Sequence, residues 1–150
     1  MPRLTFRDAT LADIPPMQVI RNAVKENVLS DPKLVTDRDY EKYIQVKGSS
    51  WVCERDNHLV GFAIADLAEN NVWALFVDPA FESKGIGKKL LTLILNWYFN
   101  QTQHPIWLST EANTRAETFY RKQGWQQTGF HKSEIKFEMT YEDWAKQVVI

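Results

Sequence analysis

The residues best suited to chemistry lie in the stretch FVDPAFESKGIGKKLL, residues 76–91, where one apolar run ends and a second begins. Gly85 and Gly87 stand between the two runs, and lysines flank them. A helix that begins here exposes unpaired backbone N–H groups and about half a positive charge, and small residues let an anion approach those donors. The stretch therefore predicts a cradle for a diphosphate. The alternative is a plain strand-to-helix turn with solvated lysines.

Two familiar phosphate-binding signatures do not fit this stretch. The P-loop needs a glycine, four further residues and then Gly-Lys-Ser/Thr, whereas Glu82 takes the place of the first glycine and Lys89 that of the hydroxyl residue. The dinucleotide fingerprint needs a third glycine where this chain has Leu90. The backbone from Ser83 to Lys88 would therefore form an anion site of another class.

The composition narrows the class of protein. With 150 residues and a net charge of −1, the chain is expected to form one domain, 1–150, without a nucleic-acid or membrane partner. No uncharged apolar run approaches the ~20 residues of a membrane span, and the N-terminus lacks the apolar core of a signal peptide. Cys53 is the single cysteine, which suits a reducing compartment. We expect a soluble, cytoplasmic protein.

The histidines and the cysteine do not indicate a reactive site. His58, His104 and His131 fall in predicted turns or loops, without a second histidine or cysteine at a ligand spacing. Cys53 falls in a predicted strand, where a cysteine is commonly a small buried residue. The sequence therefore predicts no metal site and no cysteine nucleophile.

Hydrophobic periodicity and turn signals predict an alternation of helices and strands. Strands are expected over residues 4–10, 105–110, 125–130 and 133–140, and as a three-stranded meander within residues 48–78. Helices are expected over residues 17–27, 36–46, 85–100 and 113–124, with a short terminal helix or tail over 141–147. The strand–helix–strand unit from Val72 to Ser109 requires a parallel pair with a right-handed crossover. The predicted class is α/β, of the mixed α+β kind.

A second stretch, EANTRAETFYRKQGW (111–125), completes a pattern with DPAFESKGIGKKLL (78–91) that resembles the GNAT superfamily of N-acetyltransferases. The family motif Arg/Gln-X-X-Gly-X-Gly/Ala maps onto residues 82–87. The later motif Asn-X-X-Ala-X-X-Phe-Tyr-X-X-X-Gly-Phe/Trp fits from Asn113 to Trp125 at every named position. One departure is Glu82, which stands where the family often has Arg or Gln and is expected to weaken cofactor binding without abolishing it.

The resemblance implies a GNAT-like acyl-CoA N-acyltransferase fold. Its central sheet is mixed and mostly antiparallel, with helices on both faces and one splayed parallel strand pair, here VWALFV and IWLST. Acetyl-CoA would be the co-substrate, with its pantetheine arm in the gap between these strands. The resemblance implies that the cofactor-binding residues are Phe76, Val77, Ser83, Lys84, Gly85, Ile86, Gly87, Lys88, Asn113 and Phe119.

The resemblance also implies a catalytic role for Tyr120, as the acid that protonates the departing thiolate. A phenol with a pKa near 10 can supply a proton to the thiolate of a thiol with a pKa near 8.5. The alternative is that Tyr120 is only a core aromatic of an amphipathic helix. The base that takes the proton of the amine stays open between Glu111, Asp66 and a water chain, and either carboxylate could be a solvated strand end.

The acceptor also stays open between a small-molecule amine and a peptide amine. In this fold its pocket would be lined by the region between Arg21 and Tyr43, the turn after Asp66 and the last strands. A homodimer is common among similar proteins. Two rival functions remain: a non-catalytic acyl-CoA-binding module of the same fold, and a phosphate-binding domain that prefers another nucleotide.

Overall fold

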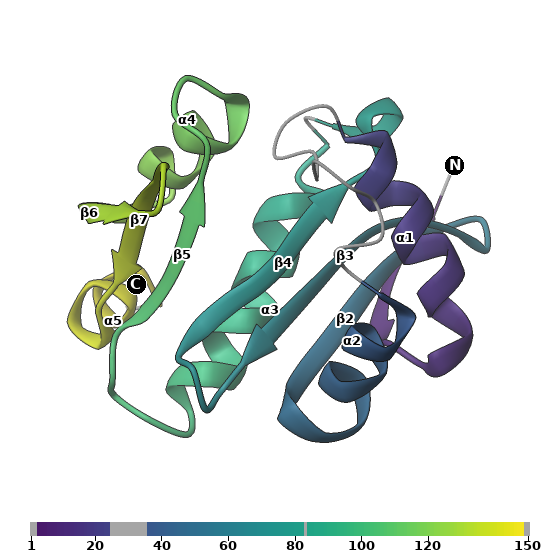
Figure 1. Ribbon diagram of the computed structural model, residues 1–150, viewed down its shortest axis with the longest axis horizontal. Helices are drawn as coiled ribbons and strands as arrows, with labels where there is room; N and C mark the ends of the chain where they lie inside the picture. The colour runs from purple at the N-terminus through teal and green to yellow at the C-terminus, as the bar shows by residue number, and fades with distance from the viewer. Residues whose placement is uncertain (1–2, 25–35, 83, 149–150) are drawn as a thin grey trace.

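The computed structural model describes residues 3–24, 36–82 and 84–148. Their seven strands form one mixed sheet in the order β1-β2-β3-β4-β5-β7-β6, with helices on both faces (Figure 1). The strands are β1 (Leu4–Asp8), β2 (Gly48–Arg55), β3 (His58–Asp66), β4 (Asn71–Val77), β5 (Ile106–Thr110), β6 (Gln126–His131) and β7 (Glu134–Met139). The helices are α1 (Ile14–Ala23), α2 (Asp37–Lys42), α3 (Ile86–Phe99), α4 (Arg115–Lys122) and α5 (Tyr141–Val148). The predicted fold class is confirmed.

The observed elements match the predicted order, with shifted ends. Thr10 begins a short 3-10 turn (Leu11–Asp13) that leads into α1, where two prolines occupy the first turn as predicted. The helix predicted over 36–46 begins at the cap Thr36 but ends its regular part at Lys42 and continues as a π-helical turn (Tyr43–Lys47). Residues 25–35, which include the end of the first predicted helix and a predicted loop, lie outside the described residues.

Two hydrophobic cores cover the two faces of the sheet. On one face α3 packs Leu90 against Ala63 of β3, and seven residues of α3 are buried, as its nearly all-round apolar pattern predicted. On the other face Met17 of α1 and Tyr40 of α2 pack against Phe62 of β3. Figure 1 shows α1 and α2 on one side of the sheet and α3 on the other. None of the helices within the described residues is long and apolar enough to cross a membrane.

The parallel strands β4 and β5 separate along their length. Their register holds one pair, Asn71 with Trp107, and at this end the Trp107 N–H donates to the carbonyl of Asn70 at 2.9 Å. The neighbouring ladders are extensive, because β4 pairs with β3 as far as Val77 and β5 pairs with β7 from Ile106 to Thr110. The separation is therefore a splay between two intact half-sheets, as the resemblance implied, and Figure 1 shows it widening toward α4.

Strand β4 carries one extra residue within its ladder to β3. Val72 pairs with Ala65 and Ala74 pairs with Ile64, so Trp73 has no partner of its own. Such a bulge shifts the alternation of side chains along the strand. The bulged residue Trp73 and, further along, Phe76 belong to the core under α1 and α2. Val77 packs against the core under α3, so the end of β4 contributes to both faces.

The closed end of the splay depends on a buried phenol. The Tyr98 hydroxyl of α3 donates to Asn70 Oδ1 at 2.6 Å and lies 3.3 Å from the carbonyl oxygen of Pro105. The Nδ2 group of Asn71 donates to the carbonyl of Trp107 at 3.1 Å. These bonds tie α3 and the start of β5 to the turn before β4. They hold together the one place where the half-sheets meet.

We predict that Tyr98→Phe lowers the free energy of unfolding by about 1–2 kcal/mol, because it removes a fully buried donor and leaves its acceptors unsatisfied. Urea denaturation measures the change. Tyr141→Phe is the matched control, since no described residue hydrogen-bonds to that hydroxyl, and it should change stability by less than about 0.5 kcal/mol. Equal effects of the two variants would contradict the role given to Tyr98.

Candidate active site

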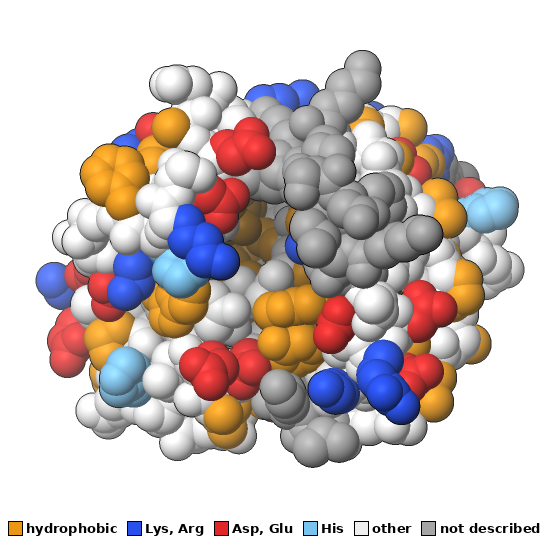
Figure 2. All heavy atoms as spheres, in the orientation of Figure 1, with side chains coloured by type: hydrophobic (Ala, Val, Ile, Leu, Met, Phe, Trp, Pro, Cys, Tyr) orange, Lys and Arg blue, Asp and Glu red, His pale blue; other side chains and the backbone are white. Residues whose placement is uncertain are grey.

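A cavity of about 550 Å³ occupies the open part of the splay. Its lining comes from the end of β4 (Leu75, Phe76 and Val77), the turn after it, the start of α3 and the exposed side of α4. In the orientation of Figure 1, the space-filling view shows a hollow on this face with hydrophobic side chains at its floor (Figure 2). The mixture of an apolar floor and a few charged groups at the rim is typical of a small-molecule site.

The start of α3 forms one wall of this cavity. Gly85 is the residue before the helix and has φ +82°, the left-handed conformation that glycine adopts without strain. A β-carbon at Gly87 would lie 3.6 Å from the ring of Phe119 and 3.7 Å from Val77. The first turn of α3 therefore approaches β4 and α4 closely. It brings Gly87, Val77 and Phe119, all predicted cofactor residues, to one place.

Only some of the remaining residues of the predicted cradle line the cavity. Ile86 and Lys88 line the cavity, whereas the ammonium of Lys89 lies 6.0 Å from the ring centre of Phe6. Lys84 is exposed and outside the cavity lining, and Ser83 lies outside the described residues. The helix start thus presents backbone donors and the charge of Lys88 to the cavity, which is the chemistry that a diphosphate requires.

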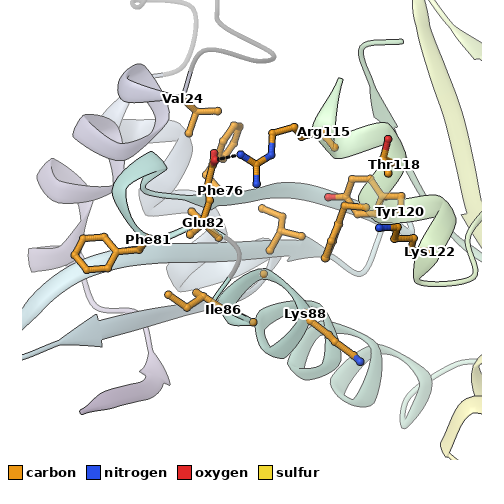
Figure 3. A pocket seen from close by; sticks show the side chains of 16 residues that line it. Val24, Phe76, Phe81, Glu82, Ile86, Lys88, Arg115, Thr118, Tyr120 and Lys122 are labelled. Atoms are coloured by element: carbon orange, nitrogen blue, oxygen red, sulfur yellow. Dashed lines mark hydrogen bonds and ion pairs between the residues drawn. The ribbon is translucent and has the colours of Figure 1, made fainter. Parts of the chain in front are cut away.

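Tyr120 of α4 presents its hydroxyl to the cavity. Its side chain is 7 % exposed, and its ring packs against those of Phe119, Trp125 and Phe137 at centroid distances of 5.2, 5.7 and 6.1 Å. Figure 3 shows the hydroxyl directed toward the space between α4 and β4. Burial raises the pKa of Tyr120, so that the phenol stays protonated at neutral pH. The residue is therefore both a core aromatic and an available proton donor.

Glu82 is ion-paired across the mouth of the cavity. Arg115, the first residue of α4, places its Nη1 atom 2.6 Å from Glu82 Oε2 (Figure 3). The two side chains come from opposite walls and are 33 % and 64 % exposed, so the pair contributes little stability by itself. Its effect is electrostatic: the carboxylate that replaces the family's usual Arg or Gln carries its own counter-ion. This compensation offsets the repulsion that Glu82 alone would exert on an anionic ligand.

The two carboxylates considered as bases lie outside the cavity lining. Asp66 is 2 % exposed at the end of β3, accepts the backbone N–H of Glu69 at 3.1 Å, and pairs with Asn71 at the closed end of the splay. Glu111 follows β5 and is exposed. Glu82 is the one acid among the described residues that line the cavity. A catalytic role of Glu111 stays a prediction, and Asp66 serves the β3–β4 turn.

Asn113 has a backbone role that the sequence did not specify. It has φ +63°, and its N–H donates to Glu117 Oε1 at 2.8 Å. The cap of α4 is Thr114, whose hydroxyl accepts the Glu117 N–H at 3.3 Å. Asparagine tolerates this left-handed conformation better than most residues do. Its side chain is outside the cavity lining, so its predicted contact with the cofactor arm stays a prediction.

Sequence reasoning missed three polar residues of α4 that line the cavity: Arg115, Thr118 and Lys122. They recur at intervals of three and four residues, which places them on one side of the helix with Phe119. That spacing was visible in the sequence, although nothing local showed that this side faces a cavity. Within the described residues, no group of three or more His, Cys, Asp or Glu side chains could hold a metal ion.

The splayed mixed sheet is the fold of solved N-acetyltransferase structures. Similar solved structures support the fold: the PaiA N-acetyltransferase of Thermoplasma acidophilum in complex with coenzyme A has a TM-score of 0.82 at 16% identity, covering 93% of this chain and 99% of that one. The ribosomal-protein-S18-alanine N-acetyltransferase of Escherichia coli has a TM-score of 0.71 at 15% identity, covering 91% and 92%.

Sequence comparison establishes the family. A profile described as Acetyltransferase (GNAT) family matches residues 17–125, and the chain belongs to that family. The ribosomal protein bS18-alanine N-acetyltransferase of Haemophilus ducreyi is 35% identical over 95 residues. This match spans 61% of the chain and 62% of the relative, so the chain covers less than two thirds of that relative's length. The family predicted from the two motifs is confirmed.

The left-handed conformation at Gly85 leads to a stability prediction. Gly85→Ala should lower the free energy of unfolding by about 1–2 kcal/mol, because a β-carbon makes φ +82° unfavourable even though the space around it is open. Gly87→Ala is the control: its β-carbon meets only ordinary contacts, and stability should change by less than about 0.5 kcal/mol. Thermal or urea denaturation measures both, and similar losses for the two variants would refute the distinction.

Proposed function

We propose that this protein transfers the acetyl group of acetyl-CoA directly to a primary amine, with Tyr120 as the general acid. The observation that carries the proposal is the position of Tyr120: its hydroxyl points into a cavity that lies between two separated strands and beside the start of α3. A buried phenol aimed at an open cleft is suited to proton transfer and is not required for packing alone. The reaction class follows from the family.

The cavity suits an acyl-CoA in shape and charge. Beyond Asn71 the edge of β4 has no pairing to β5 within the described residues, so its backbone groups near Phe76 and Val77 are available to an extended pantetheine arm. The apolar floor suits the arm, and the helix start with Lys88 suits the diphosphate. Acetyl-CoA is the substrate that supplies a thioester, which the amine attacks as coenzyme A leaves as a thiolate.

Tyr120 supplies the proton that the leaving thiolate needs. The O–H bond of the phenol breaks as the thiol S–H bond forms, and the proton lost by the amine restores the phenol through solvent or a carboxylate. A main-chain N–H near Phe76 or Val77 is the candidate donor to the developing oxyanion. The base remains a water chain or Glu111. Because the relative is an N-acetyltransferase for an alanine of ribosomal protein bS18, a peptide N-terminus is one acceptor class to test beside small amines.

The rival function is a non-catalytic acyl-CoA-binding module. It is favoured by the cavity lining, whose one acid among the described residues is already paired to Arg115. A thermal-shift series with acetyl-CoA, coenzyme A and ATP, followed by thiol release over an amine panel, separates the two. Stabilisation by acetyl-CoA together with thiol release supports the transferase. Stabilisation without release over the whole panel supports the rival, and stronger stabilisation by ATP contradicts both.

Replacing Tyr120 with Phe tests the acid directly. We expect kcat to fall about 100-fold or more while the Kd for acetyl-CoA changes less than threefold, because general acid catalysis is typically worth about 10² to 10⁴. Because burial raises the phenol pKa above its ordinary value, the donor stays protonated, and the ratio of wild-type to variant rates should stay constant from about pH 6.5 to 9. Tyr141→Phe is the control, and equal rates for Tyr120→Phe and wild type would remove the role.

The Glu82–Arg115 pair gives a second test, on cofactor affinity. Arg115→Ala leaves the Glu82 carboxylate without this partner and should weaken acetyl-CoA binding about threefold to tenfold. Adding Glu82→Gln to that variant should recover most of the loss, since the repulsive charge is then gone. Calorimetric titration at low and high salt measures the effect. A double variant as weak as Arg115→Ala would show that Glu82 does not oppose the cofactor.

A further inference from the structure

Arg21, near the end of α1, has two nitrogen atoms for which the described residues supply no hydrogen-bond acceptor. Its Nε and Nη1 atoms are buried, and their N–H groups donate to no acceptor among the described residues. The side chain as a whole is partly exposed. Nε–H and the N–H groups of Nη1 lie on different sides of the guanidinium, and each can donate a charge-assisted hydrogen bond to an oxygen of a carboxylate or phosphate. Leaving buried N–H groups of an arginine unpaired is costly, so a native protein keeps such groups where water or a ligand completes their hydrogen bonds.

We propose that Arg21 binds an oxyanion on the acceptor, so that the substrate is an amine that also carries a carboxylate or phosphate. The proposal rests on the acetyl transfer proposed above and names the acceptor class for that same site.

Aromatic rings fix the position of the guanidinium. Its central carbon lies 4.7 Å from the ring centre of Phe76 and 5.5 Å from that of Trp73. The bulge in β4 turns Trp73 to this face, where its ring lies 5.4 Å from Tyr40 and 4.3 Å from Tyr43. A guanidinium held over aromatic rings leaves its N–H groups free to donate hydrogen bonds. The cation is therefore preorganised, which lowers the entropy lost when an anion binds.

A second unpartnered donor lies beside this cation. Tyr40 is fully buried, and its hydroxyl has no hydrogen-bond partner among the described residues. Burial raises the pKa of Tyr40, and both the charge of Arg21 and the approach of its N–H groups to the phenol oxygen oppose that rise. The phenol therefore stays protonated and close to the guanidinium. Two adjacent donors without acceptors are complementary to one oxyanion.

The acidic groups of this face do not supply the missing acceptor. Asp39 of α2 accepts from the N–H and hydroxyl of Thr36 at 2.8 and 3.1 Å. Asp37 receives the side-chain amide of Gln18 at 3.4 Å, and Asp66 receives the Glu69 N–H. None of them is within hydrogen-bond distance of the unpartnered atoms of Arg21.

Arg21 lies next to residues that line the cavity, on the face of the sheet opposite to the start of α3. Phe76, on which Arg21 stacks, lines the cavity, and so does Val24, one helical turn after Arg21. Both belong to the core under α1 and α2, whereas the helix start that suits a diphosphate lies on the opposite face with α3. Arg21 itself lies outside the cavity lining, behind Phe76, so an acceptor that extends past Phe76 toward α1 would reach Arg21 while its amine faces the cavity.

Matched acceptor pairs test the proposal. Amino acids are compared with their carboxamides, and ethanolamine phosphate with ethanolamine, for wild type, Arg21→Gln and the control Arg121→Gln. Arg121 is a fitting control because its guanidinium also lies over an aromatic ring, 5.1 Å from the ring centre of Phe137, but is paired with Glu117. We expect wild type and control to prefer the anionic member of at least one pair by about tenfold or more in kcat/KM, and Arg21→Gln to lose that preference through KM. The responding pair distinguishes carboxylate from phosphate.

Tyr40→Phe separates binding from folding. Because its hydroxyl has no partner, the variant should be at least as stable as wild type, yet its KM for the anionic acceptor should rise about threefold to tenfold. A purely structural Tyr40 would leave KM unchanged. Arg21→Lys keeps the positive charge but not the planar guanidinium with its several N–H donors, so it should recover only part of the preference.

A binding measurement keeps the proposal distinct from the transferase activity. Calorimetry with coenzyme A present compares the N-acetylated products of each pair. Anion-selective binding that disappears in Arg21→Gln upholds the oxyanion site even if no amine is acetylated, an outcome that would overturn only the proposed transfer. The proposal is overturned if anionic and neutral members bind and react equally well. That result is expected if only water hydrogen-bonds to the unpartnered N–H groups of Arg21.

Discussion

The separation of β4 from β5 is the constraint on which the rest of the structure depends. Parallel neighbours normally share a continuous ladder, yet here register is kept at Asn71 and Trp107 and lost beyond them. Each strand is paired along its other side, apart from the bulge at Trp73, and the hydrogen bonds of Tyr98 hold the closed end together. The result is a cleft with unpaired strand edges inside a packed sheet. Without it, Tyr120 would be an ordinary core aromatic.

Both faces of the sheet contribute side chains to the cleft, because β4 ends between the two hydrophobic cores. Val77 belongs to the α3 side, where the helix start, Gly87 and Lys88 offer donors and positive charge to an anionic cofactor. Phe76 belongs to the α1 side, where aromatic rings hold Arg21. The proposed direct transfer would bring two substrates together in this cleft, one from each face. The bulge at Trp73 and the splay supply that arrangement with backbone geometry alone.

Local sequence signals predicted the elements well where the signals are strong. The buried pattern of α3, the cap at Thr36 and the stop at Gly124, with φ +91°, appear as expected. The π-helical turn after α2 and the left-handed conformation of Asn113 were not predicted, because each depends on how the chain must join packed elements. Asp66 looked like a candidate base from its place at a strand end, but the turn that it caps lies at the closed end of the splay.

By itself the sequence determined the family, the order of elements and the two motifs, since these follow from residue types at fixed short spacings. The tertiary structure decided which of those residues share a cavity. It paired Glu82 with Arg115, 33 positions apart, and placed Arg21 on the ring of Phe76, 55 positions away. Charge compensation and unpartnered donors are properties of distances between remote side chains. No local pattern encodes them, because they arise only when the two half-sheets and their helices have packed.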